Sequence, residues 1–275
     1  MKKYIAILIF STTVANAQLK TPSLSPASKI VQTIGLTEVE VEYSRPSVKG
    51  RAVFGNTGLL PNNNFWRTGA NTATKISFSK AVIVGGNELE KGAYTILTVP
   101  NEKKWEIRWY KYESTNWNTY IEKTPLFTIE VPVIENTELI ETLEIHFKNI
   151  TMSSADLVIE WEHKKVVILI EVDESKEILK SIGRQLNGPS DFDYFNAALY
   201  LHEAKGDLTK ALEYIQKVTK SDKALFFQVT REALILKDLK RYKEAKEVAK
   251  RGLELSEKAK NNDFIQLNKK MIEEL

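Results

Sequence analysis

The chain has 275 residues, with 39 lysines and arginines against 36 aspartates and glutamates, and it contains no cysteine. Without cysteine there are no disulfides, thiolate metal ligands, cysteine nucleophiles or lipid anchors attached through a thiol. The balanced charge lacks the clustered positive excess that nucleic acid requires, so we expect no nucleic-acid partner.

The first 17 residues have the pattern of a secretory signal peptide. Two lysines precede an apolar stretch at residues 4–10, and residues 15–17 (Ala-Asn-Ala) form an A-x-A cleavage signal. We therefore predict cleavage between Ala17 and Gln18 and an exported protein, either periplasmic or secreted. A membrane anchor and a first buried strand are the alternatives. The apolar stretch, however, is shorter than the roughly 20 residues of a spanning helix, and no later stretch is long enough.

Residues 18–173 are predicted to form a β domain, because apolar residues recur there with a period of two. Polar outward faces favour an antiparallel β-sandwich over a barrel. Eight stretches are predicted as strands: 39–44, 74–79, 93–99, 104–110, 126–133, 142–148, 155–161 and 166–172. Turn signals are found at Gly85-Gly86-Asn87, Lys91-Gly92, Pro100-Asn101-Glu102 and His163-Lys164-Lys165.

Near Asp173 the apolar period changes to 3.6, which predicts helices for the rest of the chain. A linker helix over residues 174–189 should stop at Gly188-Pro189. Residues 190–275 are predicted to form a helical domain. Its expected parts are helix pairs at 194–218 and 230–255, with breaks at Gly206-Asp207 and Leu239-Lys240-Arg241, and a capping helix at 263–275.

The two helix pairs resemble tetratricopeptide repeats. Aligning residues 208–218 with 242–252 places Ala211 against Ala245, a spacing of 34 residues with a small side chain at the helix crossing. A generic helical bundle is the alternative, since only two copies are present and the usual Trp-Leu-Gly run is missing. The predicted fold class is thus α+β with two domains. Repeats of this kind present a concave face to peptides, so a protein or peptide partner is expected there.

Catalytic and metal-binding motifs are absent from the sequence. His146, His163 and His202 have no second ligand at a metal-binding spacing, and we expect neither a metal nor a cofactor. His146 and Glu160 are expected to face each other across neighbouring strands as a surface contact. No nucleophile elbow, H-E-x-x-H helix or phosphate-binding loop occurs.

Residues 44–71 form the most informative segment, because four cations, two prolines and four glycines are concentrated there. An arginine fork beside a tryptophan face suits a carboxylate, a phosphate or a stacked sugar. The alternative is a scaffold in which arginines hold loop carbonyls, Trp66 closes the end of the sandwich and Asn71 caps a turn. The candidate pocket for an anionic or glycan ligand consists of Arg45, Arg51, Trp66, Arg67 and Asn71.

These motifs resemble a family of exported bacterial proteins that is catalogued as a domain of unknown function. The resemblance rests on S-R-P-S-x-K-G-R (44–51), L-P-x-x-x-x-W-R-T-G-A-N (60–71), G-x-x-L-x-x-G-x-Y-x-I-x-x-x-P (86–100), Trp105 and Trp117. It covers residues 25 to 172 and implies an exported β-rich domain, followed in some members by repeat-like helices, without an established activity. The chain departs from the pattern at Trp117-Asn118, where a glycine is expected to follow the tryptophan, so a pocket shaped by that turn would differ.

Two functions are compatible with the sequence. The favoured hypothesis is a non-catalytic envelope protein that binds a ligand or another protein. The alternative is a hydrolase that acts on envelope polymers or glycans with carboxylates near the arginine-rich segment. A cleft with a carboxylate of raised pKa beside Trp66 would favour the enzyme.

Overall fold

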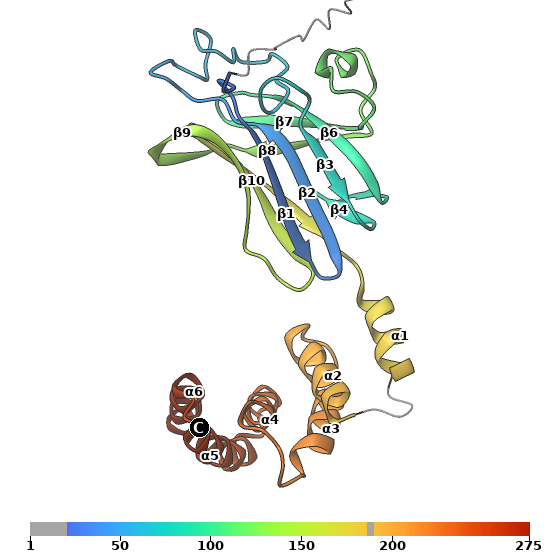
Figure 1. Ribbon diagram of the computed structural model, residues 1–275, viewed down its shortest axis with the longest axis vertical. Helices are drawn as coiled ribbons and strands as arrows, with labels where there is room; N and C mark the ends of the chain where they lie inside the picture. Colours follow the sequence, from blue (N-terminus) through green and yellow to red (C-terminus); the bar gives the residue numbers. More distant parts are fainter. Residues whose placement is uncertain (1–20, 186–189) are drawn as a thin grey trace, which may run out of the picture.

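The computed structural model describes residues 21–185 and 190–275 of the chain. A β-sandwich is followed by an array of helices, and helix α1 (Ser175–Gln185) lies between them (Figure 1). The predicted signal peptide and the predicted helix stop at Gly188-Pro189 lie outside the described residues.

The β domain is a sandwich of two antiparallel sheets, as the polar and apolar alternation predicts. The six-stranded sheet has the order β1-β2-β3-β6-β7-β8: β1 (Ala27–Ile34), β2 (Thr37–Ser44), β3 (Lys75–Phe78), β6 (Gly92–Val99), β7 (Lys104–Lys111) and β8 (Phe127–Pro132). The four-stranded sheet has the order β5-β4-β10-β9: β5 (Asn87–Leu89), β4 (Val82–Val84), β10 (Ser154–Glu171) and β9 (Ile134–Lys148). A short 3-10 helix, η1 (Trp117–Tyr120), lies between β7 and β8.

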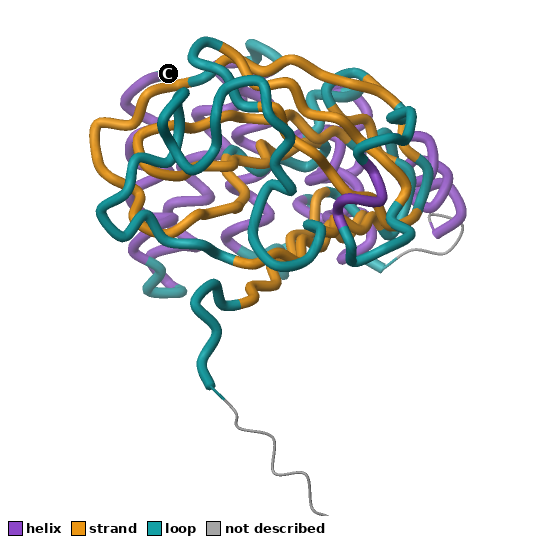
Figure 2. Tube along the Cα trace, turned by 90° about the horizontal axis from the view of Figure 1, so that it is seen from above, coloured by secondary structure: helices purple, strands orange, loops and turns teal. Residues whose placement is uncertain are grey.

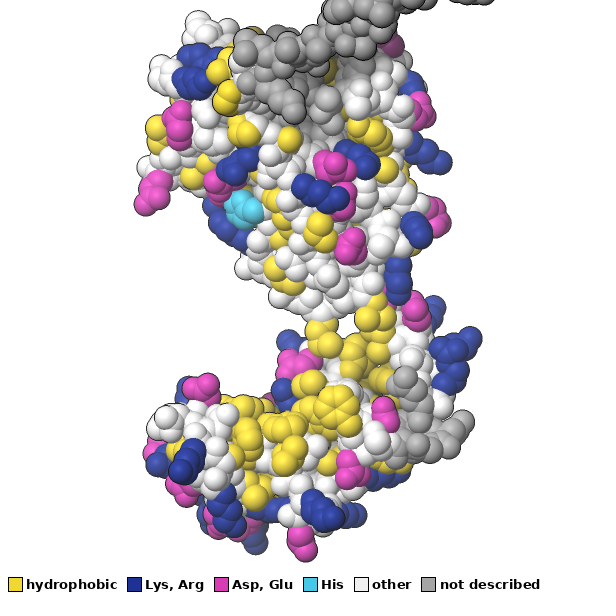
Figure 3. All heavy atoms as spheres, viewed as in Figure 1, with side chains coloured by type: hydrophobic (Ala, Val, Ile, Leu, Met, Phe, Trp, Pro, Cys, Tyr) yellow, Lys and Arg dark blue, Asp and Glu magenta, His cyan; other side chains and the backbone are white. Residues whose placement is uncertain are grey.

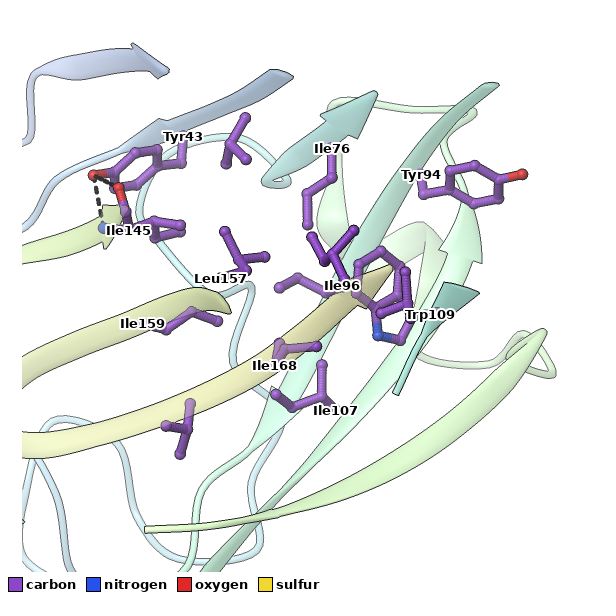
Figure 4. Close-up of a cluster of buried hydrophobic side chains, with 14 of the residues drawn as sticks. Tyr43, Ile76, Tyr94, Ile96, Ile107, Trp109, Ile145, Leu157, Ile159 and Ile168 are labelled. Carbon is purple, nitrogen blue, oxygen red and sulfur yellow. Dashed lines mark hydrogen bonds between the residues drawn. The ribbon is translucent and has the colours of Figure 1, made fainter. Parts of the chain in front are cut away.

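Apolar side chains from the two sheets meet between them and form the core. Ile107 and Trp109 of β7 and Ile145 of β9 are at most 1% exposed. Figure 4 shows side chains from both sheets pointing toward one another across this layer. The hydroxyl of Tyr43 also accepts a hydrogen bond from the backbone nitrogen of Ile145 at 2.9 Å, which links β2 to β9.

The predicted turn at His163-Lys164-Lys165 is wrong, because β10 continues through it. The residues that β10 contributes to the sandwich core are odd-numbered up to Trp161 and even-numbered from Val166 on. The change of parity coincides with irregular pairing: the β9–β10 register shifts on both sides of Glu162, whose φ is 55°, and β9 advances from Glu144 to Ile134 while β10 advances only from Glu160 to Lys165. The charged run therefore marks a β-bulge inside one long strand.

Three strands were not predicted. The first, β1, is an edge strand and pairs only with β2 among the described strands. The other two, β4 and β5, have three residues each, too few to show a period. They form a hairpin through the predicted turn at Gly85-Gly86, where both glycines have positive φ.

Glu174 fastens the start of α1 to the β domain. Its carboxylate is 7% exposed and accepts hydrogen bonds from the backbone nitrogen of Leu36 (2.5 Å) and the hydroxyl of Thr37 (2.9 Å). Lys80 pairs with the same carboxylate at 3.2 Å. Gly35 has a φ of 59°, and a Cβ there would lie 2.4 Å from the Glu174 carboxylate, so the β1–β2 turn requires glycine.

The helices α2 to α6 pack as successive hairpins in an arc (Figure 1). Ala211 and Ala245, aligned in the sequence at a spacing of 34, are both fully buried in one core. No helix of residues 21–185 or 190–275 is long and apolar enough to cross a membrane. The helices are α2 (Asp191–Glu203), α3 (Leu208–Thr219), α4 (Phe226–Asp238), α5 (Tyr242–Lys258) and α6 (Asn262–Glu274).

Candidate functional site

Residues 44–71, the arginine loop, connect β2 toward β3 at the end of the sandwich that is remote from the helices (Figure 1). Figure 2 views this end from above, with the loops in teal. The loop is bound to the six-stranded sheet by two backbone hydrogen bonds between Trp66 and Thr98, of 2.7 and 2.8 Å. Asn63 and Asn71 have positive φ, a conformation that asparagine tolerates better than most residues. Two of the loop's asparagines are therefore explained by the backbone conformation at their positions.

Trp66 belongs to the sandwich core. Its side chain is 4% exposed and stacks on Trp161 with the ring centroids 5.9 Å apart. It also makes edge contacts with Trp105 and Phe54. The indole nitrogen donates to the carbonyl of Gly69 at 3.0 Å. Trp66 thus closes the end of the sandwich and fixes the turn that follows it.

Three of the five predicted site residues line one cavity of about 370 Å³: Trp66, Arg67 and Asn71. Arg67 donates one hydrogen bond to the carbonyl of Asn71 (2.9 Å), and its guanidinium lies 4.9 Å from the centroid of the Trp117 ring. No carboxylate in residues 21–185 or 190–275 lies within 4.0 Å of it. Burial lowers the pKa of the Arg67 guanidinium, so its charge lies in a partly desolvated place.

Arg45 and Arg51 are not part of this cavity. Arg45 donates to the carbonyl of Leu143 and to the carboxylate of Glu144, both at 2.9 Å. Arg51 donates to the carbonyls of Val48 (3.0 Å) and Ser47 (2.7 Å) within its own turn. The five predicted pocket residues are therefore not all together in the structure. Arg45 binds strand β9, and Arg51 binds backbone carbonyls of its own turn.

The departure at Trp117-Asn118 lies beside the cavity. Asn118 is the second residue of η1, and its backbone nitrogen donates to the side chain of Asn116 at 3.2 Å. Trp117 covers one side of Arg67. The turn at Trp117-Asn118 therefore forms part of the surroundings of Arg67, the arginine of the loop that lines the cavity.

Arg67→Ala tests whether this arginine is part of the scaffold. The structure gives it one carbonyl, in an exposed hydrogen bond, and one cation–π contact. We expect the substitution to cost about 1 kcal/mol, or roughly 2–4 °C in melting temperature for a protein of this size. Thermal unfolding followed by circular dichroism measures it. A loss comparable to that of a core tryptophan would show that the arginine holds the fold.

A second candidate site lies in the helical array. Five phenylalanines from α2, α4 and α6 form a continuous row, with ring centroids 5.0 to 6.4 Å apart. None of the five is fully buried, and Phe192 is 62% exposed. In Figure 3 apolar side chains gather on the inner side of the helical arc, toward the β domain. The aromatic row consists of Phe192, Phe195, Phe226, Phe227 and Phe264.

Four members of the aromatic row line a groove of about 370 Å³, together with Leu199, Leu234 and Leu267. The charged lining residue is Arg231, which donates to Glu203 (2.5 Å) and to the ring nitrogen of His202 (2.8 Å). Its charge is therefore compensated within the protein. The groove offers mainly apolar surface to a partner.

An apolar cavity of about 610 Å³ lies beside α2, where α1 and α2 meet the tip of the β1–β2 hairpin. Leu36 and Met152 of the β domain line it and are 55% and 43% exposed. Ile182 and Tyr200 line it from the helices. Helix α2 thus has apolar surface on two sides: one side faces the β domain, and the other faces the groove.

Sequence reasoning missed the aromatic row, although its signal is present. Phe192 and Phe195 open α2, Phe226 and Phe227 open α4, and Phe264 lies in the first turn of α6. Phenylalanines thus occur within the first five residues of three alternate helices. In stacked helical hairpins such positions lie on one face.

Comparison with known proteins supports both halves of this description. Residues 193–225 and 230–258 match the tetratricopeptide repeat, which confirms the predicted repeats. Neither the curated proteins nor the solved structures that were compared with the chain gave a match. Residues 25–170, the sandwich with its arginine loop, match the family described as "Protein of unknown function (DUF2911)", and the chain belongs to that family.

Proposed function

We propose that this protein is a non-catalytic binding module whose helical groove holds an extended apolar segment of another protein. The observation that carries the proposal is the aromatic row on the first turns of α2, α4 and α6. Tetratricopeptide repeats generally bind peptides on their concave face, and the match of residues 193–225 and 230–258 to this repeat supports the proposal. In stacked hairpins α2, α4 and α6 share one face, and their aromatic side chains line the groove.

The chemistry of the groove indicates the kind of segment. A buried aromatic side chain removes about 150–250 Å² from water, and aromatic residues dominate binding energies in interfaces. The groove has no uncompensated charge among its lining residues, so an acidic or basic peptide gains little from it. We infer a partner segment with several aliphatic or aromatic side chains spaced to meet successive helices.

Hydrolysis has less support than binding. The cavity beside Trp66 has no carboxylate among its lining residues. Three carboxylates contact the arginine loop outside the cavity lining, and each accepts a hydrogen bond of 2.9 Å there: Glu141 from the nitrogen of Lys49, Glu144 from Arg45 and Glu162 from the nitrogen of Val53. A general acid and base free to act on a substrate are therefore not provided at this cavity.

The proposal includes export. It is supported by the basic, apolar and A-x-A pattern of residues 1–17, which is typical of a secretory signal. N-terminal sequencing of the protein from its host should begin at Gln18, and a sequence beginning at Met1 would contradict export by cleavage.

A second candidate ligand, a small carboxylate or a sugar, is favoured by one observation: Arg67 lines a cavity without a carboxylate partner among the described residues. A ligand that binds the folded state raises the melting temperature. Melting curves with a panel of organic acids and sugars should show such a rise in the wild type and none in Arg67→Ala.

Peptide selection tests the main proposal. The protein is immobilised and used to enrich short random peptides from a display library, with Phe227→Ser as the counter-target and Tyr242→Ser as a matched control. Tyr242 is an aromatic residue on α5, 50% exposed and outside the groove. We expect apolar peptides that bind the wild type and Tyr242→Ser but not Phe227→Ser. Enrichment that is equal on all three proteins would contradict a groove-bound partner.

A further inference from the structure

Three side chains with metal-ligating atoms converge on the outer face of the four-stranded sheet. Glu144 and His146 point outward from β9, because their neighbours Leu143 and Ile145 point into the core. Glu160 points outward from β10 by the same alternation and lies directly opposite Glu144 in the register. His146 is opposite Val158, one diagonal step from Glu160.

The distances fit ligands of a single ion. One ligand atom from each residue can be chosen so that all three lie within 4.8 Å of one another. The His146 Nε2 and the Glu160 Oε1 are 3.6 Å apart, which is too long for a hydrogen bond. Two atoms about 2.1 Å from a tetrahedral zinc ion are separated by roughly 3.4 Å. The distance of 3.6 Å between His146 Nε2 and Glu160 Oε1 is therefore closer to the separation of two zinc ligands than to the length of a hydrogen bond.

Both carboxylates are held through one oxygen, which leaves the other for a ligand. Arg45 donates to Glu144 Oε1 at 2.9 Å, and Asn136 donates to Glu160 Oε2 at 3.1 Å. Outer partners of this kind orient the ligands of metal sites. The arginine of the S-R-P motif thus has a role at this cluster that its sequence position did not indicate.

Burial and charge also favour a cation here. Glu160 is 7% exposed, and among the described residues its carboxylate receives one hydrogen bond, from Asn136. It faces Glu144 directly across the strands, and like charges in that position destabilise a sheet unless they are compensated. Arg45 pairs with one of the two carboxylates. A buried carboxylate requires a counter-charge.

His146 is prepared to act as a ligand. Its Nε2 lies 3.6 Å from the Glu160 carboxylate, and its side chain is 26% exposed. Its Nδ1 is buried, and no hydrogen-bond partner for it is found in residues 21–185 or 190–275.

We propose that Glu144, His146 and Glu160 bind one divalent transition-metal ion, and that Zn²⁺ is the ion their chemistry fits best. Imidazole together with carboxylate suits zinc, whereas magnesium and calcium prefer sets made only of oxygen atoms. Three protein ligands leave a fourth position for water. The Glu144 side chain is 46% exposed, so solvent reaches the cluster from that side. Sequence inspection paired His146 with Glu160 as a surface contact and expected no metal, because it did not include Glu144 as a third ligand.

Zinc titration of the metal-free, full-length protein tests the proposal. After dialysis against a chelator, calorimetry should show one zinc ion bound per chain, with a dissociation constant in the micromolar range or tighter. His146→Gln and Glu144→Gln should each abolish this binding, and Asn136→Ala should weaken it about 10- to 100-fold. His163→Gln is the matched control, because His163 is an exposed histidine of the same strand pair, outside the cluster.

Measuring the stability of each variant without zinc distinguishes loss of zinc binding from loss of folding. Glu144 is half exposed, so Glu144→Gln should fold, and circular dichroism without zinc verifies this. Zinc should raise the melting temperature of the wild type and of His163→Gln, and leave that of Glu144→Gln unchanged. The absence of saturable binding, or binding that persists in His146→Gln and Glu144→Gln, would overturn the proposal and leave a simple His–Glu contact.

Discussion

Replacement of Trp66 by alanine should lower the free energy of unfolding by about 3–5 kcal/mol, the usual cost of truncating a buried tryptophan. The indole is 4% exposed and packs against Trp161, Trp105 and Phe54. Its removal opens a cavity where the two sheets meet and releases the hydrogen bond to Gly69. The melting temperature should fall by roughly 6–20 °C, which thermal unfolding followed by circular dichroism would show.

Trp66→Phe is the matched control for this effect. It keeps most of the ring and loses the N–H donor to Gly69, so the expected cost is about 1 kcal/mol for the hydrogen bond, plus a smaller packing loss. If Trp66→Ala melted within a degree or two of the wild type, the tryptophan would not hold the end of the sandwich. A ligand-binding role for its ring would then become the better explanation.

Phe227→Ser should weaken binding of a selected apolar peptide by roughly 30-fold, which corresponds to a hot-spot loss of about 2 kcal/mol. Phe227 lies in the middle of the aromatic row, 5.2 Å from Phe195 and 5.5 Å from Phe226 between ring centroids. It also lines the groove. Fluorescence anisotropy with a labelled peptide measures the change in affinity.

Two further variants separate a local effect from unfolding. Phe192→Ser changes a side chain that is 62% exposed, so it should keep the fold and still reduce affinity. Tyr242→Ser on α5 should leave affinity unchanged. Equal affinity of the wild type and both phenylalanine variants would show that the groove does not contact the peptide.

The sequence predicted the class and most elements of the fold because alternation and helical period are local signals. The strand at residues 142–148 and the helix breaks at Gly206-Asp207 and near Lys240 are confirmed. The irregular pairing around Glu162 was mistaken for a turn, because a bulge and a turn can both change the parity of the core positions.

The sites were predictable only in part, because their partners are distant along the chain. Arg67 and Asn71 are four residues apart, and the structure brings them together. Arg45 instead reaches Leu143 and Glu144, nearly a hundred residues away, and spacing along the sequence does not reveal such a contact. The aromatic row likewise depends on how three hairpins stack. Whether the arginine loop binds a ligand stays a prediction.

The central claim is that the inner face of α2, α4 and α6 binds an apolar segment of a partner protein. The most direct measurement is photo-cross-linking with p-benzoylphenylalanine placed at position 192 on α2 or, as the control, at position 242 on α5. Both positions are at least half exposed in the native chain. With a selected peptide we predict cross-linking from position 192 and none from position 242. Cross-linking from position 242 alone, or from neither position despite binding, would contradict the claim.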